Sequence, residues 1–155
     1  MKNELKILRL KENNLDLFIE LVTLFNEVFE EYHTIATKEH LTQLLGKPDF
    51  CAMAVIKNHM VVGGLTAYEL ERYYNDQSEL YIYDIAVKTE LHNQGIGKAL
   101  IEFLKNYSTN NGIETIFVEA HTEDEQAVKF YEAIFGESEK VDHFNFEVKS
   151  AGNTE

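Results

Sequence analysis

The segment that says most about the fold joins two short strings, Asp84-Ile85-Ala86-Val87 and, eight residues later, Gly95-Ile96-Gly97-Lys98. The first string ends the strongest strand pattern in the chain, at 79–87, and the second opens a helical pattern at about 97–110. A helix N-terminus presents backbone N–H groups without helical partners and the positive end of the helix dipole. Because glycines let a phosphate approach the backbone, the segment predicts a strand, an anion-binding loop and a helix.

Apolar periodicity extends this unit in both directions along the chain. We expect further strands at 4–10, 51–57, 60–70 and 113–120, and further helices from Leu17 with Asn13 or Asn14 as N-cap, at 37–45 and at 125–135. A terminal hairpin or pair of strands is expected at 137–148. The prediction is an α/β (α+β) domain at 1–149 with a tail at 150–155. Its mixed, mostly antiparallel sheet is flanked by helices, in the order βααβββαβαβ(β).

The composition narrows the choice of partners. The 155 residues include 14 Lys and Arg against 27 Asp and Glu, which gives a net charge of −13. This excess argues against nucleic acid and anionic membranes as partners, and it suits either solubility or a cationic partner. Since no apolar run approaches the ~18 residues of a membrane span and no signal-peptide pattern is present, we expect a cytoplasmic protein.

Two common phosphate-binding motifs can be compared with the glycine loop. A dinucleotide-binding fingerprint would need glycine at Leu100. A nucleotide P-loop would need glycine at His92 and Ser or Thr at Ala99. Neither motif is present, so the loop must bind its anion in another arrangement.

The loop resembles the acetyl-coenzyme A site of the GNAT acetyltransferases, whose signature is Arg/Gln-x-x-Gly-x-Gly/Ala after a strand that ends in an Ala-Val-like pair. Here Ala86-Val87 ends the strand, and His92 stands at the first signature position. The family's Asn-x-x-Ala-x-x-Phe/Leu-Tyr pattern is matched by 124–131, with Asp124 in place of Asn. The string at 78–87 and the stretch at 141–144 are similar to those of type I aminoglycoside 3-N-acetyltransferases.

This resemblance implies acetyl-coenzyme A as the cosubstrate and no metal. The residues that it assigns to cosubstrate binding are Ile85, Ala86, Val87, His92, Asn93, Gln94, Gly95, Ile96, Gly97, Lys98 and Asp124. Because the loop is expected to hold pyrophosphate mainly through main-chain N–H groups, His92 at the first signature position does not break the match. Asp124 in place of Asn means that a side-chain amide contact to the cosubstrate is not carried over. The resemblance also implies a bulged strand whose N–H near Ile85 or Val87 polarises the thioester carbonyl. A homodimer is expected because many relatives pair through the sheet edge or C-terminal strands.

Acetyl transfer to an amine requires a proton acceptor, because an alkyl ammonium with a pKa of about 10 is mostly protonated at pH 7. Asp84 is the first candidate, as a carboxylate in an otherwise apolar strand. The structural alternative is that it caps a turn or pairs with a cation. Further candidates for the base are Glu79, Glu119, His121 and Asp124.

The resemblance points to Tyr131 as the general acid toward the coenzyme A sulfur. A phenol is a suitable donor for a departing thiolate, although Tyr131 on a helix is also an ordinary half-buried aromatic. Cys51 begins a hydrophobic strand and is read as a buried structural residue rather than a nucleophile. His121, Glu123 and Asp124 lack the spacing of a metal site.

The sequence therefore predicts acetyl transfer from acetyl-coenzyme A to a primary amine, by direct attack in a ternary complex. The resemblance favours a polycationic aminoglycoside modified at its 3-amino group, which would confer antibiotic resistance. Candidate carboxylates for the cationic acceptor are Glu30, Glu31, Glu79 and Glu119. Two alternatives stay open: the same chemistry on a polyamine, amino acid or protein amine, and a non-catalytic acetyl-coenzyme A-binding module.

Overall fold

The computed structural model describes residues 4–151. The chain forms two compact units, Met1–Glu119 and Ala120–Glu155. The predicted domain at 1–149 and tail at 150–155 extend beyond the described residues at both ends, and their boundaries stay predictions. Among residues 4–151, no helix is both long enough and apolar enough to cross a bilayer.

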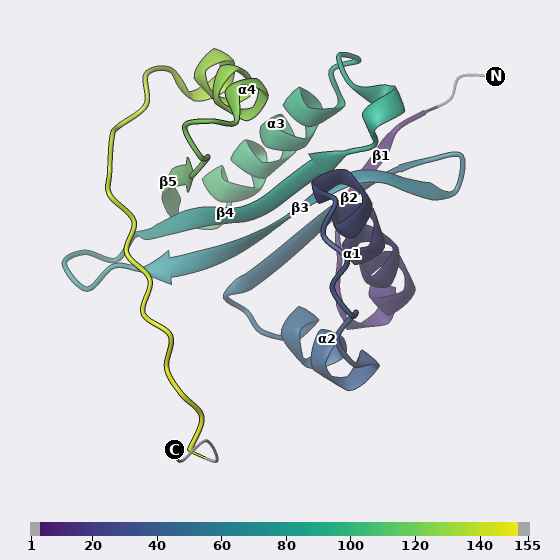
Figure 1. Ribbon diagram of the computed structural model, residues 1–155, viewed down its shortest axis with the longest axis horizontal. Coiled ribbons are helices and arrows are strands. Elements are labelled where there is room, and N and C mark those ends of the chain that lie inside the picture. The colour runs from purple at the N-terminus through teal and green to yellow at the C-terminus, as the bar shows by residue number, and fades with distance from the viewer. Residues whose placement is uncertain (1–3, 152–155) are drawn as a thin grey trace. The chain divides into compact units, whose positions relative to one another are not determined.

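A five-stranded sheet forms the centre of the first unit (Figure 1). Its strands lie side by side in chain order: β1 (Lys6–Arg9), β2 (Phe50–Lys57), β3 (Met60–Glu71), β4 (Ser78–Val87) and β5 (Ile113–Val118). The first four pair antiparallel, whereas β4 and β5 pair in parallel. A parallel pair needs a crossover connection, and α3 (Ile96–Thr109) supplies it. The predicted mixed, mostly antiparallel sheet is therefore confirmed.

Helices cover both faces of this sheet. Phe50, Ala52 and Ala54 of β2 belong to one buried cluster with apolar residues of α1 (Leu15–Phe29) and α2 (Lys38–Leu45). The alternate residues of β2 are also buried and, because side chains alternate along a strand, point to the opposite face, where α3 packs. This double burial explains why β2 reads as a continuous apolar run rather than an alternating one.

Two local features of the backbone shape the β2–β3 hairpin. Asn58 and His59 both have positive φ, of 51° and 63°, as a tight two-residue hairpin turn between β2 and β3 requires. Gly64 lies where the chain approaches its neighbours closely. A Cβ at this position would press against the Met53 carbonyl oxygen and lie 2.5 Å from a Leu21 methyl carbon. The glycine therefore lets α1 pack directly on β3.

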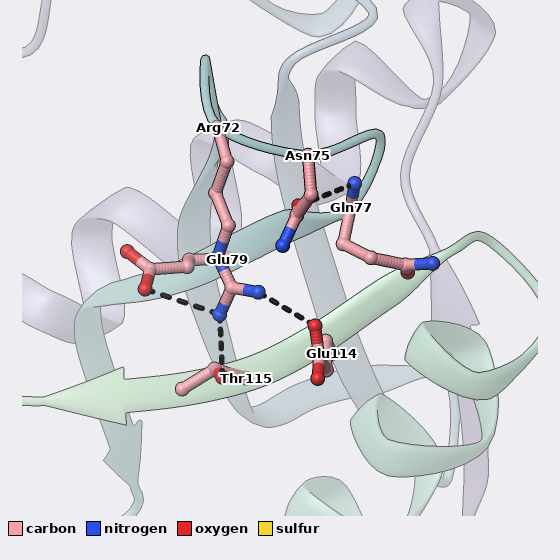
Figure 2. Close-up of polar contacts among 6 residues, drawn as sticks. All are labelled: Arg72, Asn75, Gln77, Glu79, Glu114 and Thr115. Atoms are coloured by element: carbon pink, nitrogen blue, oxygen red, sulfur yellow. Dashed lines mark hydrogen bonds and ion pairs between the residues drawn. The ribbon is translucent and has the colours of Figure 1, made fainter.

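Arg72 ties the β3–β4 connection to β5 (Figure 2). Its guanidinium donates to Glu114 at 2.6 Å and to the Thr115 hydroxyl at 2.9 Å, both on β5, and to Glu79 of β4 at 3.3 Å. The Arg72 side chain is only 11% exposed, whereas its partners Glu79 and Glu114 are 33% and 58% exposed and stay open to water. The contacts join β4 and β5 near Ser78 and Ile113, where the parallel pairing of the two strands begins.

The second unit contains α4 (Glu125–Phe135), whose bounds match the predicted helix. Asp124 is its N-cap and accepts a bond from the Ala127 N–H at 3.1 Å. The strands expected at 137–148 are wrong, because these residues form neither strand nor helix. Phe144, Phe146 and Val148 alternate as strand residues do, yet they are 86–90% exposed. An alternating pattern produces a strand only where a neighbouring strand pairs with it, and the described residues of the chain supply none.

Candidate active site

The site begins where β4 and β5 separate. Their parallel pairing ends at Ile82 and Val118, whereas β4 continues for five more residues to Val87. On its other edge β4 stays paired with β3 as far as Val87 opposite Gly63. The segment 83–87 therefore presents one edge of backbone N–H and C=O groups that β5 does not occupy.

A β-bulge in β4 determines which of its side chains lie on the same face of the sheet at this opening. Ile82 pairs with Ala67 and Asp84 pairs with Thr66, so Tyr83 is an extra residue on β4. The extra residue shifts the alternation by one, which places Asp84 on the face of Tyr81 rather than that of Ile82. The bulge that the family resemblance implied is therefore present, at Tyr83.

Asp84 is a half-buried carboxylate in this bulged segment. Burial first, and then the negative charge of Glu31, raises the pKa of Asp84 from 3.8 to about 6. Glu31 lies in the connection after α1, where its carboxylate is 3.2 Å from the His33 ring. A carboxylate with a pKa near 6 is ionised at neutral pH and is more basic than an ordinary aspartate.

The loop after β4 has the backbone of an anion site. Asn93 and Gly95 both have positive φ, of 62° and 81°, and α3 begins at Ile96. The first helical bond is donated by the Ala99 N–H to the Gly95 carbonyl, so the three preceding N–H groups have no acceptor within the helix. A Cβ on Gly95 would meet nothing within 4 Å, so space is open beside the loop.

His92 has a structural partner in this loop. Its Nε2 lies 2.9 Å from the Val87 carbonyl oxygen, which links the loop back to the end of β4. This contact gives a local reason for a histidine at a position where the family signature has Arg or Gln. Lys98 lies exposed in the first turn of α3.

The candidate acceptor carboxylates do not all gather at the opening. Glu119 directly follows β5, and the Tyr81 hydroxyl donates to it at 3.4 Å. Glu30 ends α1 in a left-handed conformation, beside Glu31. Glu79 instead lies five residues before Asp84 on β4, about 16 Å along the strand, in the ion pair with Arg72.

The second unit holds the other predicted residues. Tyr131 is half-buried on α4, with its ring against Phe130 and Phe135 at centroid distances of 5.5 and 6.2 Å. Asp124 uses a side-chain oxygen to cap α4. His121 is exposed in the connection before the helix. Within residues 4–151, no three potential metal ligands cluster.

Sequence reasoning missed Tyr81 and Tyr83 as parts of the site, because only the pairing register reveals the bulge. Their alternation with Leu80 and Ile82 reads as an ordinary strand, and no letter marks the extra residue. Cys51 agrees with its predicted structural role. Burial raises the pKa of its thiol to about 11, against the smaller lowering effect of Arg9, so the sulfur stays protonated and unreactive.

Comparison with known proteins gives one family. The profile of the acetyltransferase (GNAT) family matches residues 18–136, which includes β4, the glycine loop and α4. A comparison with curated proteins found no significant match.

Two aminoglycoside acetyltransferases from uncultured soil metagenomic samples are similar over nearly their whole length. The crystal structure of meta-AAC0020 in complex with trehalose aligns with a TM-score of 0.91 and 42% identity, covering 96% of this chain and 99% of that one. The same enzyme has been crystallised with sisomicin. HMB0005 aligns with a TM-score of 0.90 and 36% identity, over 94% of this chain and 99% of that one.

A more distant structure shares the fold. The aminoglycoside N-acetyltransferase AAC(6')-Iy in complex with CoA aligns with a TM-score of 0.80 at 15% identity, over 95% of this chain and 97% of that one. From the family match and the overall similarity, the chain belongs to the GNAT family of acetyltransferases.

Proposed function

We propose that this GNAT enzyme transfers the acetyl group of acetyl-coenzyme A to a primary amine of an aminoglycoside, at its 3-amino group, by direct attack in a ternary complex. The observation that carries the proposal is the bulged, open end of β4, where Asp84 has a pKa of about 6 beside an unoccupied backbone edge. Similarity to two aminoglycoside acetyltransferases supports the choice of acceptor.

The residues at the opening fit the cosubstrate. The free edge at 85–87 can bind an amide-containing arm as a strand would, and the start of α3 offers N–H groups to a pyrophosphate. Space beside Gly95 leaves room for that anion. When bound, acetyl-coenzyme A supplies an activated acetyl thioester.

The N–H groups of Ile85 and Val87 are proposed to stabilise negative charge that develops on the carbonyl oxygen. In the register of β4 they belong to the bulged segment, where the edge toward β5 is open. The Lys88 N–H donates to Val62 on β3, and backbone groups alternate along a strand, so the N–H groups of both Ile85 and Val87 point to the open edge. Asn93 and Gln94 would hold the loop around the anion through their backbone, while His92 fixes the loop to Val87.

Asp84 is proposed as the base. Its oxygen accepts a proton from the acceptor ammonium, which leaves a neutral amine able to attack the carbonyl carbon. The raised pKa makes Asp84 a better proton acceptor than an ordinary aspartate while leaving it ionised above pH 6. The Tyr131 hydroxyl is proposed to donate a proton to the departing sulfur and to regain one from the nitrogen, which loses a proton as the amide forms, while Asp84 releases its proton to solvent. Asp124 is proposed to flank the cosubstrate.

The charge distribution supports a cationic acceptor. Three lysines and two glutamates lie within 88–112, which leaves a net charge of +1 across the cosubstrate loop and helix and −14 elsewhere. The anionic cosubstrate can thus be held by main-chain N–H groups in a stretch that is not acidic, while carboxylates attract the amine. Glu30, Glu31 and Glu119 are the proposed acceptor contacts, and Glu79 stays a prediction, since Arg72 engages it.

A homodimer is the proposed assembly. β5 ends the strand order among the described residues, and Phe144, Phe146 and Val148 present a strand-like apolar row to solvent. Pairing of this row with a second copy of the chain would bury it. We further propose that the enzyme is cytoplasmic and confers antibiotic resistance. Expression of the enzyme in a susceptible bacterium would test the resistance.

An amine panel tests the function. Thiol release from acetyl-coenzyme A would be followed with sisomicin, a kanamycin-type amine, spermidine, an amino acid and a lysine peptide. We expect release with the aminoglycosides. Release only with spermidine, the amino acid or the peptide would favour the alternative acceptors, and cosubstrate binding without turnover of any amine would favour a non-catalytic binding module.

A further inference from the structure

Tyr81 occupies a defined place beside the opening of the sheet. It pairs with Phe117 one position before the last paired residues of β4 and β5. Its ring stacks on that of Phe117 with a centroid distance of 4.8 Å and an angle of 7° between planes. It also contacts the bulged Tyr83 ring, at 6.1 Å. These contacts fix the ring, and with it the direction of the hydroxyl.

The Tyr81 hydroxyl donates to Glu119, the first residue after β5. Burial raises the pKa of Tyr81, and the charge and hydrogen bond of Glu119 raise it further, so the phenol is a donor at neutral pH. Glu119 is exposed and directly follows Val118, the last paired residue of β5. A hydrogen bond from a fixed hydroxyl limits the rotamers that the carboxylate can adopt.

Asp84 and Glu119 border the same opening from opposite strands. Ile82 and Val118 form the last parallel pair of β4 and β5. Asp84 lies two residues beyond this pair on β4, and Glu119 lies one residue beyond it on the chain of β5. The bulge places Asp84 on the same face of the sheet as Tyr81, whose hydroxyl reaches Glu119, so an acceptor at the opening on that face meets both carboxylates. The charges of both raise the pKa of Tyr81, which is consistent with this proximity.

We infer that Tyr81 is a positioning residue that holds the Glu119 carboxylate for a second ammonium group of the acceptor, while Asp84 serves the reacting amine. The inference rests on the proposed function and extends it to a substrate class: amines with two ammonium groups a few bonds apart. A monoamine gains nothing from Glu119 once Asp84 has taken its proton. The two carboxylates at the separated ends of β4 and β5 therefore select for diamines.

The substitution Tyr81→Phe tests this role, because it removes the hydroxyl and keeps the ring on Phe117. Kinetic constants would be measured with sisomicin, 1,3-diaminopropane and propylamine, using an inhibition constant where an amine is not turned over. We expect KM for sisomicin and for 1,3-diaminopropane to rise about three- to tenfold, the net worth of one typical hydrogen bond. The KM or inhibition constant for propylamine, the kcat values and the KM for acetyl-coenzyme A should stay unchanged.

Two further variants separate positioning from a merely structural effect. Tyr107→Phe removes another half-buried phenol, on α3, and should change none of these constants. In a Glu119→Gln background, which should itself raise KM for the polyamines alone, Tyr81→Phe should add little, since both changes remove one interaction.

The inference is overturned if Tyr81→Phe leaves the polyamine KM unchanged, raises the propylamine constant equally, or keeps its full effect beside Glu119→Gln. Should Tyr81→Phe fail to fold, Glu119→Gln alone decides, by the same contrast between diamine and monoamine. A wild-type enzyme that acetylates no amine refutes the proposed function, and the inference with it. Wild-type turnover without the contrast refutes the inference alone.

Discussion

At the scale of single residues, Asp84 combines a chemical advantage with a cost in stability. Sequence reasoning selected it because it is the one carboxylate in an apolar strand segment. The pattern did not reveal why it faces the opening, since its orientation depends on the Tyr83 bulge. Its raised pKa further depends on burial and on Glu31, which is 53 residues earlier in the chain and in no recognisable motif with it.

Asp84→Asn should stabilise the fold at neutral pH. Because the folded-state pKa of about 6 exceeds the ordinary 3.8, the folded protein binds the proton more tightly, and the free energy of unfolding falls as pH rises from about 4 to 6. The amide removes this penalty. We expect a gain on the order of 1 kcal/mol at pH 7.5, discounted for solvent exposure, and almost none at pH 4. Denaturant unfolding at the two pH values measures the gain, and equal stability at pH 7.5 would contradict the assigned pKa.

Tyr131→Phe should lower kcat by about a hundredfold, the usual contribution of a general acid, with little change in KM for acetyl-coenzyme A. The ring contacts with Phe130 and Phe135 stay in place, so the fold should be retained. Steady-state kinetics measures the effect. Tyr73→Phe, which alters a fully exposed phenol in the β3–β4 connection, is the matched control. An unchanged kcat in Tyr131→Phe would remove the residue from the mechanism.

At the scale of elements, the segment from β4 to α3 is where sequence prediction was strongest. The strand, the positive-φ loop and the helix start all lie within a residue or two of the predicted bounds, because their signals are local. The strands expected at 137–148 failed for the opposite reason. A strand requires a partner, and alternation in one segment carries no information about what lies beside it.

The close packing of α1 on β3 predicts a position-specific cost for a single methyl group. Gly64→Ala should destabilise the protein by about 1–3 kcal/mol, because its Cβ would overlap the Met53 carbonyl oxygen and the Leu21 side chain. Gly112→Ala is the control. It meets open space but has a φ of +69°, so it should cost only about 1 kcal/mol of backbone strain. Thermal unfolding ranks the two variants, and a smaller loss at Gly64 would contradict the packing described.

At the scale of the whole molecule, the charge of −13 gains a physical interpretation. From composition it suited either solubility or a cationic partner. The structure adds carboxylates on β4 and directly after β5 at the opening. It also adds a helix start whose first N–H groups have no acceptor within the helix, where we propose that the cosubstrate binds. The identity of the acceptor could not follow from composition, since a net charge does not locate any carboxylate.

The exposed apolar row at the C-terminal end predicts the assembly. The double variant Phe144→Ser, Phe146→Ser should convert a dimer into a monomer, because it removes the apolar side chains that a second copy would bury. Light scattering after size exclusion measures the mass. Tyr73→Ser, an exposed aromatic elsewhere, should leave the dimer intact. A wild-type protein that is monomeric at all concentrations would contradict the proposed assembly.

The central claim joins the acceptor, the reaction and the base. The most direct measurement is sisomicin-dependent thiol release from acetyl-coenzyme A by wild type and Asp84→Asn between pH 5 and 9, with the product examined by NMR. We predict an amide at the 3-amino group, a wild-type rate that falls below pH 6, and a loss of at least about a hundredfold in Asp84→Asn. Absence of thiol release with sisomicin, or full activity in Asp84→Asn, would contradict the account.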